Sequence, residues 1–258
     1  MRVTLASVPA RAGRANEDFT GATPTAAVLV DGAGIPGAEA VCRHGVAWYA
    51  HRLGGALLGL SSSPDSLPAL LAEAITRVTD AHRDTCDVAD PISPSAAVAV
   101  VRLSGDLLEH LVLGDAVVVL GRTDGPPVIS TDRREVVVSQ AYQRLLERGD
   151  DPQRVLRDLR AHRNRPGGFW VAKDDPRAAD EAVTGRLPVT EVSTATLLSN
   201  GASRIVDRFA LTDWPALLTV LASTGPAAII DQVRQAEESH AVPPDDATIT
   251  HCTDLSSI

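Results

Sequence analysis

The sequence lacks several features that mark large classes of proteins. It holds only three cysteines, Cys42, Cys86 and Cys252, and this odd count without paired spacing argues against a disulfide framework and fits a reducing compartment. No C-x-x-C pair exists, so a structural zinc site is not expected. Neither G-x-S-x-G nor G-x-x-x-x-G-K-[ST] occurs, which argues against an α/β-hydrolase and a P-loop protein.

Long apolar runs, linkers and basic clusters are missing too. No run of 18 apolar residues occurs, and the apolar stretch after Arg2 is too short for a signal peptide, so we expect a cytoplasmic protein without a membrane partner. No Pro-, Gly- or Ser-rich linker divides the 258 residues, and 44% apolar content suffices for one domain over 1–258. The net charge is -9 with arginines scattered among acids, so nucleic acid is not an expected partner. No pattern indicates an oligomeric state.

Hydrophobic periodicity predicts groups of strands and helices. Strands are expected over 3–8, 25–30, 95–103, 107–113, 116–120, 134–139, 190–198 and 247–252, with a short aromatic strand after the loop at 162–168. Helices are expected over 38–60, 66–84, 140–148, 152–163, 214–222 and 226–238, with Asp65 or Ser66 as the cap of the second. The strands between 95 and 120 are interpreted as an antiparallel meander. Long crossover helices between single strands are rare, so the order favours an α+β fold of two sheets with helices outside.

Acidic residues stand at three points where an apolar run meets a turn. Glu17 and Asp18 lie in an expected loop, Asp31 ends an apolar strand, and Asp245 precedes the last strand. If these strand ends converge, the carboxylates repel one another unless a cation lies between them. Carboxylate and backbone oxygens suit Mg²⁺, Mn²⁺ or Ca²⁺ better than zinc. Each acid taken alone has an ordinary interpretation as a turn or capping residue.

Five short motifs follow one another along nearly the whole chain. They are N-E-D (Asn16, Glu17, Asp18), D-G-x-G (Asp31, Gly32, Ala33, Gly34), a G-D turn (Gly114, Asp115), S-x-G (Ser199, Asn200, Gly201) and D-D-x-T (Asp245, Asp246, Ala247, Thr248). In this order the chain resembles the PPM-type, or type-2C, metal-dependent serine/threonine phosphatases, as a divergent, bacterial-like member. The resemblance implies an αββα sandwich of two antiparallel sheets flanked by helices, with two Mn²⁺ or Mg²⁺ ions at one end.

The resemblance also implies roles for individual residues. Asp31 would bridge two metal ions, with Glu17 and the carbonyl of Gly32 on one ion and Asp245 on the other. Asn200 would fill the remaining corner of the metal site. Asp18 would orient the water that the two metals activate to attack phosphoserine or phosphothreonine in a phosphoprotein or phosphopeptide.

The sequence departs from the family pattern at several of these positions. Asn200 stands where the family normally has aspartate, and an amide oxygen ligates without a charge. Arg204 stands where some members carry a further acid for a third metal, although Asp115 matches the other ligand of that metal. Arg14 is the candidate for a phosphate-binding arginine before N-E-D, and Arg11 is the other.

Three hypotheses remain open at this point. The favoured one is an active metal-dependent phosphatase. The second is a catalytically weak or inactive regulatory or binding domain on the same fold, with reduced metal occupancy. The third is an unrelated α+β enzyme. Outside the motifs, we interpret Cys42 as a buried structural thiol, His44 and His51 as surface or packing residues, and the basic loop at 163–168 as a solvated connection rather than a flap over phosphate.

Overall fold

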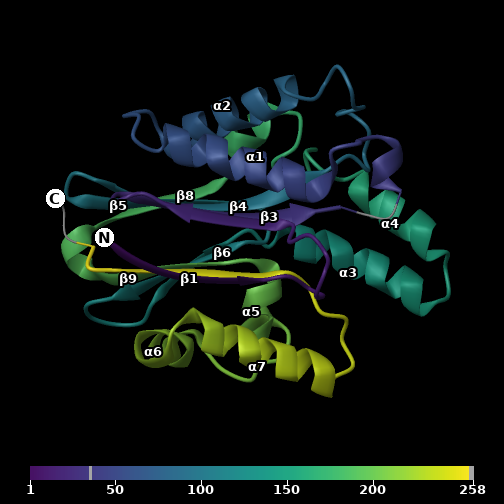
Figure 1. The fold of residues 1–258 in the computed structure, drawn as a ribbon. Coiled ribbons are helices and arrows are strands. Elements are labelled where there is room, and N and C mark those ends of the chain that lie inside the picture. Colours follow the sequence, from purple (N-terminus) through teal and green to yellow (C-terminus); the bar gives the residue numbers. More distant parts are fainter. Residues whose placement is uncertain (35–36, 256–258) are drawn as a thin grey trace.

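Two five-stranded antiparallel sheets lie face to face between layers of helices in this computed structural model, which describes residues 1–34 and 37–255 (Figure 1). The first sheet has the order β1 (Arg2–Val8), β10 (Ala247–Thr253), β9 (Val192–Leu198), β6 (Val117–Arg122) and β7 (Val128–Thr131). The second sheet has the order β2 (Asp18–Ala22), β3 (Ala26–Ala33), β4 (Ser95–Ser104), β5 (Leu107–Leu113) and β8 (Val183–Pro188).

Helices cover the outer face of each sheet. The second sheet is covered by α1 (Gly45–Leu60) and α2 (Leu67–Asp80), and the first by α5 (Asn200–Asp207), α6 (Trp214–Thr224) and α7 (Pro226–Ser239) (Figure 1). Helices α3 (Arg134–Glu147) and α4 (Pro152–Arg160) lie at one end of the sandwich (Figure 1). Short 3-10 turns complete the order: η1 (Ala38–Ala40), η2 (Pro176–Glu181) and η3 (Val189–Glu191). The predicted α+β, αββα fold is confirmed. Within the described residues, no helix has the length and apolar character needed to cross a membrane.

The apolar strands are buried on both faces. In β3, Val28 and Val30 pack with α1 and α2, whereas Ala27 and Leu29 face the opposite sheet. Side chains alternate along a strand, so one continuous apolar run supplies two different cores. A third apolar cluster lies between the first sheet and helices α5 to α7. These packed layers hold the strand ends in fixed positions, which is what a site built from strand ends requires.

The predicted helix over 66–84 begins at its expected cap. The side chain of Ser66 accepts a hydrogen bond from the amide of Ala69, with Pro68 in the first turn. The helix ends at Asp80, earlier than predicted. The predicted helix over 38–60 is divided into η1 and α1, with His44 as the N-cap of α1.

The predicted meander over 95–120 is wrong in its third strand. β4 pairs with β5, but β6 lies in the other sheet, between β9 and β7. Both faces of β6 are apolar and buried, because Val118 faces the opposite sheet and Val119 faces the helices. Periodicity therefore gave no sign of which sheet the strand joins.

The predicted strand over 134–139 is also wrong, because this segment forms the first half of α3. The carboxylate of Asp132 accepts a hydrogen bond from the amide of Arg134 and so satisfies a free N–H at the helix start. Val137 is 66% exposed and has no sheet to pack against. The expected aromatic strand is reduced to two isolated bridges, Arg163 with Phe169 and Ala96 with Ala172.

Candidate metal centre

The strand topology brings the five motifs to one end of the sandwich. The end of β3 pairs with the start of β4, and the start of β6 pairs with the end of β9, which also pairs with the start of β10. A cavity of about 290 Å³ opens at this end. Its lining includes seven of the predicted site residues: Arg14, Glu17, Asp31, Gly32, Asp115, Asn200 and Asp245. Arg11, the alternative phosphate-binding residue, is exposed and does not line this cavity.

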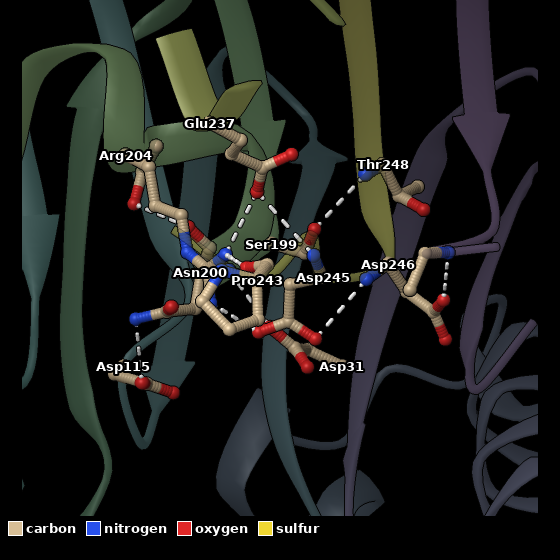
Figure 2. Close-up of polar contacts among 12 residues, drawn as sticks. Asp31, Asp115, Ser199, Asn200, Arg204, Glu237, Pro243, Asp245, Asp246 and Thr248 are labelled. Atoms are coloured by element: carbon tan, nitrogen blue, oxygen red, sulfur yellow. Dashed lines mark hydrogen bonds and ion pairs between the residues drawn. The ribbon is translucent and has the colours of Figure 1, made fainter. Parts of the chain in front are cut away.

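Asp31 stands in the middle of the acidic group. It pairs with Asp18 across the β2–β3 ladder, and one of its carboxylate oxygens accepts a hydrogen bond of 2.7 Å from the amide of Asn200 (Figure 2). Burial raises the pKa of Asp31 well above its ordinary value, and repulsion from Asp18 and Asp115 raises this pKa further.

Asp18 is the most deeply buried of these acids, with 3% of its surface exposed. No described group makes a hydrogen bond of good geometry to its carboxylate oxygens, but the hydroxyl groups of Thr248 and Ser199 lie close enough to lower its pKa. Burial raises the pKa of Asp18 to about 7, and the neighbouring Asp245 and Asp246 also raise it. The strand that carries Asp18 is held from outside, because the Nε2 atom of His51 lies 3.1 Å from the Asp18 carbonyl oxygen. Asp18 is the first residue of strand β2, whereas the sequence had suggested that it lies in a loop.

Glu17 is positioned through its backbone. Its amide donates a hydrogen bond of 2.6 Å to Asp246, and its carbonyl oxygen accepts one of 3.1 Å from the amide of Gly32. A Cβ atom at position 32 would lie 2.4 Å from that carbonyl oxygen, so the D-G-x-G motif needs glycine for this approach. Burial raises the pKa of Glu17, while Arg14, at 3.6 Å from its carboxylate, lowers it.

The two aspartates of the D-D-x-T motif have different surroundings. Asp246 is buried and its carboxylate accepts hydrogen bonds from the amides of Ala10 and Glu17, each 2.6 Å long. Asp245 lines the cavity, and half of its side chain is exposed. A Cβ atom at Gly201 would lie 2.0 Å from the carbonyl oxygen of Asp246. Glycine in S-x-G therefore lets the start of α5 approach the acidic pair.

Asn200 and Arg204, both on α5, bring hydrogen-bond donors to the acids. The Nδ2 atom of Asn200 donates a hydrogen bond of 2.9 Å to Asp115, whose pKa burial raises to about 7 (Figure 2). Arg204 is ion-paired with Asp245 at 2.5 Å and with the buried Glu237 at 2.8 Å (Figure 2). A fixed cation therefore lies beside Asp245, where the resemblance would place a further acid in some relatives.

Three charged cavity residues lay outside the predicted site: Glu135 on α3, Arg160 on α4, and Arg163, whose loop was expected to be a solvated connection. Arg163 is only 7% exposed, and its Nε and Nη2 atoms have no partner among the described residues, contrary to the expected solvated connection. The Nε atom of Arg160 is likewise buried and unpaired, and burial lowers the pKa of this guanidinium. The basic loop at 163–168 was the only sequence signal for this group.

The donor set of the cavity fits divalent cations that prefer oxygen. Asp31 and Asp115 line the cavity, and Asp18 lies next to Asp31 across the β2–β3 ladder without lining the cavity itself. Burial raises the pKa of each of the three carboxyl groups. Such a group stays ionised at neutral pH only when positive charge compensates it. The arginines that line the cavity add charge of the sign that a phosphate dianion requires.

Comparisons with known proteins concern the fold of the chain. No protein-family model and no curated protein matches the sequence. The structure is similar to the serine/threonine phosphatase PstP/Ppp of Mycobacterium tuberculosis (TM-score 0.62, 17% identity, 98% of both chains) and to Stp1 of Staphylococcus aureus (TM-score 0.61, 13% identity, 97% of this chain and 94% of the other). It is also similar to the PstP catalytic domain in complex with two manganese ions (TM-score 0.60, 17% identity, 97% of this chain and 96% of the other). The chain therefore has the PPM-type serine/threonine phosphatase fold, which confirms the predicted resemblance at the level of the fold.

Proposed function

We propose that this chain is a metal-dependent phosphatase that hydrolyses phosphoserine or phosphothreonine in a phosphoprotein or phosphopeptide. The observation that carries the proposal is the cavity lined by Glu17, Asp31, Asp115 and Asp245 at one end of a chain with the phosphatase fold. Two Mn²⁺ or Mg²⁺ ions are the proposed cofactors, since a PstP neighbour of the same fold is a complex with two manganese ions. The proposed domain is the whole chain, because β1 pairs with β10.

The residues divide the work of metal binding as follows. Asp31 would bind both ions, Glu17 and the carbonyl of Gly32 would hold one, and Asp245 with the amide oxygen of Asn200 would hold the other. Bound divalent cations neutralise phosphoryl oxygens and lower the pKa of a water molecule so that it can attack phosphorus. Asp115 would be a ligand for a third ion.

Other side chains bind and orient the reactants. Asp18, which pairs with Asp31 across the β2–β3 ladder, would accept a hydrogen bond from the attacking water and so fix its direction. Arg163 and Arg160 would offer buried, unpaired N–H groups to the phosphate, and Arg14 would offer an exposed guanidinium.

The direct test is hydrolysis of a chromogenic aryl phosphate by the full chain with and without Mn²⁺. Metal-stimulated turnover is expected, and Asp31→Ala should abolish both turnover and Mn²⁺ binding in the carboxylate cavity. Glu73→Gln is the matched control, because Glu73 is a half-exposed acid on α2 away from the cavity. The proposal fails if the wild-type chain shows no turnover at any Mn²⁺ concentration.

The second candidate function is a binding or regulatory domain with reduced metal occupancy. The observation in its favour is the pair Asn200 and Arg204, which place an uncharged amide and a cation among the expected ligands. A domain of this kind would bind a phosphopeptide with an affinity that does not depend on Mn²⁺, and it would not hydrolyse the peptide. Calorimetry with a phosphothreonine peptide, read beside the turnover assay, separates the two functions.

A further inference from the structure

Two cysteines and a histidine meet at a point that the phosphatase chemistry does not use. Cys42 and His44 lie just before α1, and Cys86 lies in the turn after α2. The sulfur atoms of the two cysteines and a ring nitrogen of His44 all lie within 4.8 Å of one another. The Nδ1 atom of His44 is 3.3 Å from the Cys86 sulfur. Because Cys42 and Cys86 are far apart in the sequence, no short motif reveals the group.

Surrounding contacts hold the three side chains in place. The amide of Asp87 donates a hydrogen bond of 2.9 Å to the carbonyl of Val41, which joins the two segments next to the cysteines. The ring of Trp48 stacks on the imidazole of His44, with 4.4 Å between ring centroids. Cys42 is 1% exposed, whereas His44 and Cys86 are partly exposed. One side of the group is therefore closed by protein and the other can be reached from solvent.

The ligand types and their spacing suit zinc. Zinc binds cysteine sulfur at about 2.3 Å and histidine nitrogen at about 2.0–2.1 Å, and its tetrahedral geometry places these ligands roughly 3.5–3.8 Å apart. The His44 nitrogen and the Cys86 sulfur already have nearly this separation. We propose that Cys42, His44 and Cys86 form a zinc site with one further position open to water or another ligand. Two sulfurs and an imidazole are softer than the oxygen ligands of the carboxylate cavity, so the two sites select different metals.

The proposed zinc site adjoins the wall of the phosphatase cavity. Cys42 lines a second cavity of about 300 Å³ together with Arg14 and Glu17. Zinc would tie the segment between η1 and α1 to the turn after α2. The segment beside Glu17 would then be held by a metal that takes no part in hydrolysis.

The test is a metal titration of the full chain, stripped of metal and kept reduced with a phosphine. One equivalent of Co²⁺ should produce thiolate-to-cobalt charge-transfer absorption, and Zn²⁺ should remove it. Cys86→Ser and His44→Ala should each weaken zinc binding by about 100-fold. Cys252→Ala is the matched control, because Cys252 is a free cysteine buried in the core between the sheets.

The Asp31→Ala variant keeps this test separate from the proposed phosphatase activity. The charge-transfer band should persist in Asp31→Ala, whether or not the wild-type chain hydrolyses phosphate. A cobalt complex without this band, or one that Asp31→Ala removes, would overturn the proposal. So would a Cys42–Cys86 disulfide in protein purified without oxidant, detected by mass after alkylation. If circular dichroism shows that Cys86→Ser does not fold, the zinc affinity of His44→Ala decides the result, because His44 is partly exposed.

Discussion

At the scale of single residues, Asn200 shows how the cluster of acids holds together without added charge. Its backbone amide donates to Asp31 and its side-chain amide donates to Asp115. Hydrogen bonds to a charged acceptor are stronger than those between neutral groups, so these two donors offset part of the repulsion between the acids. Asn200 therefore does in part what a metal ion would do, and at the same time it supplies one negative charge fewer to that ion.

The substitution Asn200→Asp should separate these two effects. It adds an anionic ligand, so we expect Mn²⁺ to bind about tenfold more tightly, which corresponds to about 1.4 kcal/mol. It also removes the donor to Asp115, so the metal-free variant should unfold at a lower temperature than the wild type. Isothermal titration calorimetry and thermal melts measure the two changes. Unchanged Mn²⁺ affinity would mean that Asn200 does not contact the metal.

The arginines make a second prediction at this scale. Arg163 is buried with unpaired N–H groups, whereas the side chain of Arg14 is 60% exposed and lies 3.6 Å from Glu17. The desolvated guanidinium of Arg163 should contribute more to phosphate binding than the exposed guanidinium of Arg14, which is already paired with Glu17. We expect Arg163→Met to raise KM for an aryl phosphate about tenfold or more, and Arg14→Met to raise it less. Steady-state kinetics at saturating Mn²⁺ gives the comparison, and the reverse order would assign the phosphate to Arg14.

At the scale of elements, the strand ends could be predicted but the sheet memberships could not. Asp31 and Asp245 were singled out because each lies where an apolar run meets a turn, and these runs are the strands β3 and β10. Asn200, which follows β9, was assigned to the site only through the resemblance of its S-x-G motif. β6 was assigned to the wrong sheet because both of its faces are buried. Its partners, β7 and β9, are decided by packing rather than by its own sequence.

Helix α3 was missed for a related physical reason. Its first turns contain three consecutive valines, which favour strands when a sheet is available to pack against. Here no sheet accepts them, and the segment becomes a helix at the end of the sandwich. For this reason Glu135 was not predicted to line the cavity. A strand over 134–139 gave no indication that this residue lies near the carboxylates.

Helix α3 should be less stable than the helices that cover the sheets. It has no buried residue, whereas α1 buries six, including Tyr49 and Leu53. Segments with few buried apolar contacts open locally at low free energy. We expect the amides of α3 to exchange with deuterium at least about tenfold faster than those of α1, a difference of roughly 1.4 kcal/mol in opening free energy. Mass spectrometry of peptic peptides measures this, and equal protection in the two helices would contradict it.

At the scale of the whole molecule, the buried acids of the cavity lower the stability of the folded chain when they are ionised. Burial raises the pKa of Asp18 and of Asp115 to about 7, against 3.8 in the unfolded chain, and it also raises the pKa of Asp31 and Glu17. The folded chain therefore binds more protons than the unfolded chain between about pH 4 and pH 7. Its stability is greatest at the acidic end of this range and is lost as the pH rises through about 7.

The metal-free protein should accordingly melt at a lower temperature at about pH 8 than at about pH 5. Mn²⁺ at about pH 8 should restore most of the lost stability, because it compensates the same charges. Thermal melts at the two pH values, with and without Mn²⁺, measure both changes.

Asp18→Asn replaces the most buried acid by a neutral side chain of the same shape. The substitution should raise the free energy of unfolding by about 2 kcal/mol at about pH 8 and change it little at about pH 5. It should also abolish turnover. Asp124→Asn, at an exposed turn, is the control and should leave the pH profile unchanged. Denaturant unfolding at the two pH values measures the effect. Equal stability of Asp18→Asn and the wild type at about pH 8 would mean that Asp18 carries no buried charge in the metal-free protein, and the cavity would then have no need for the cations proposed for it.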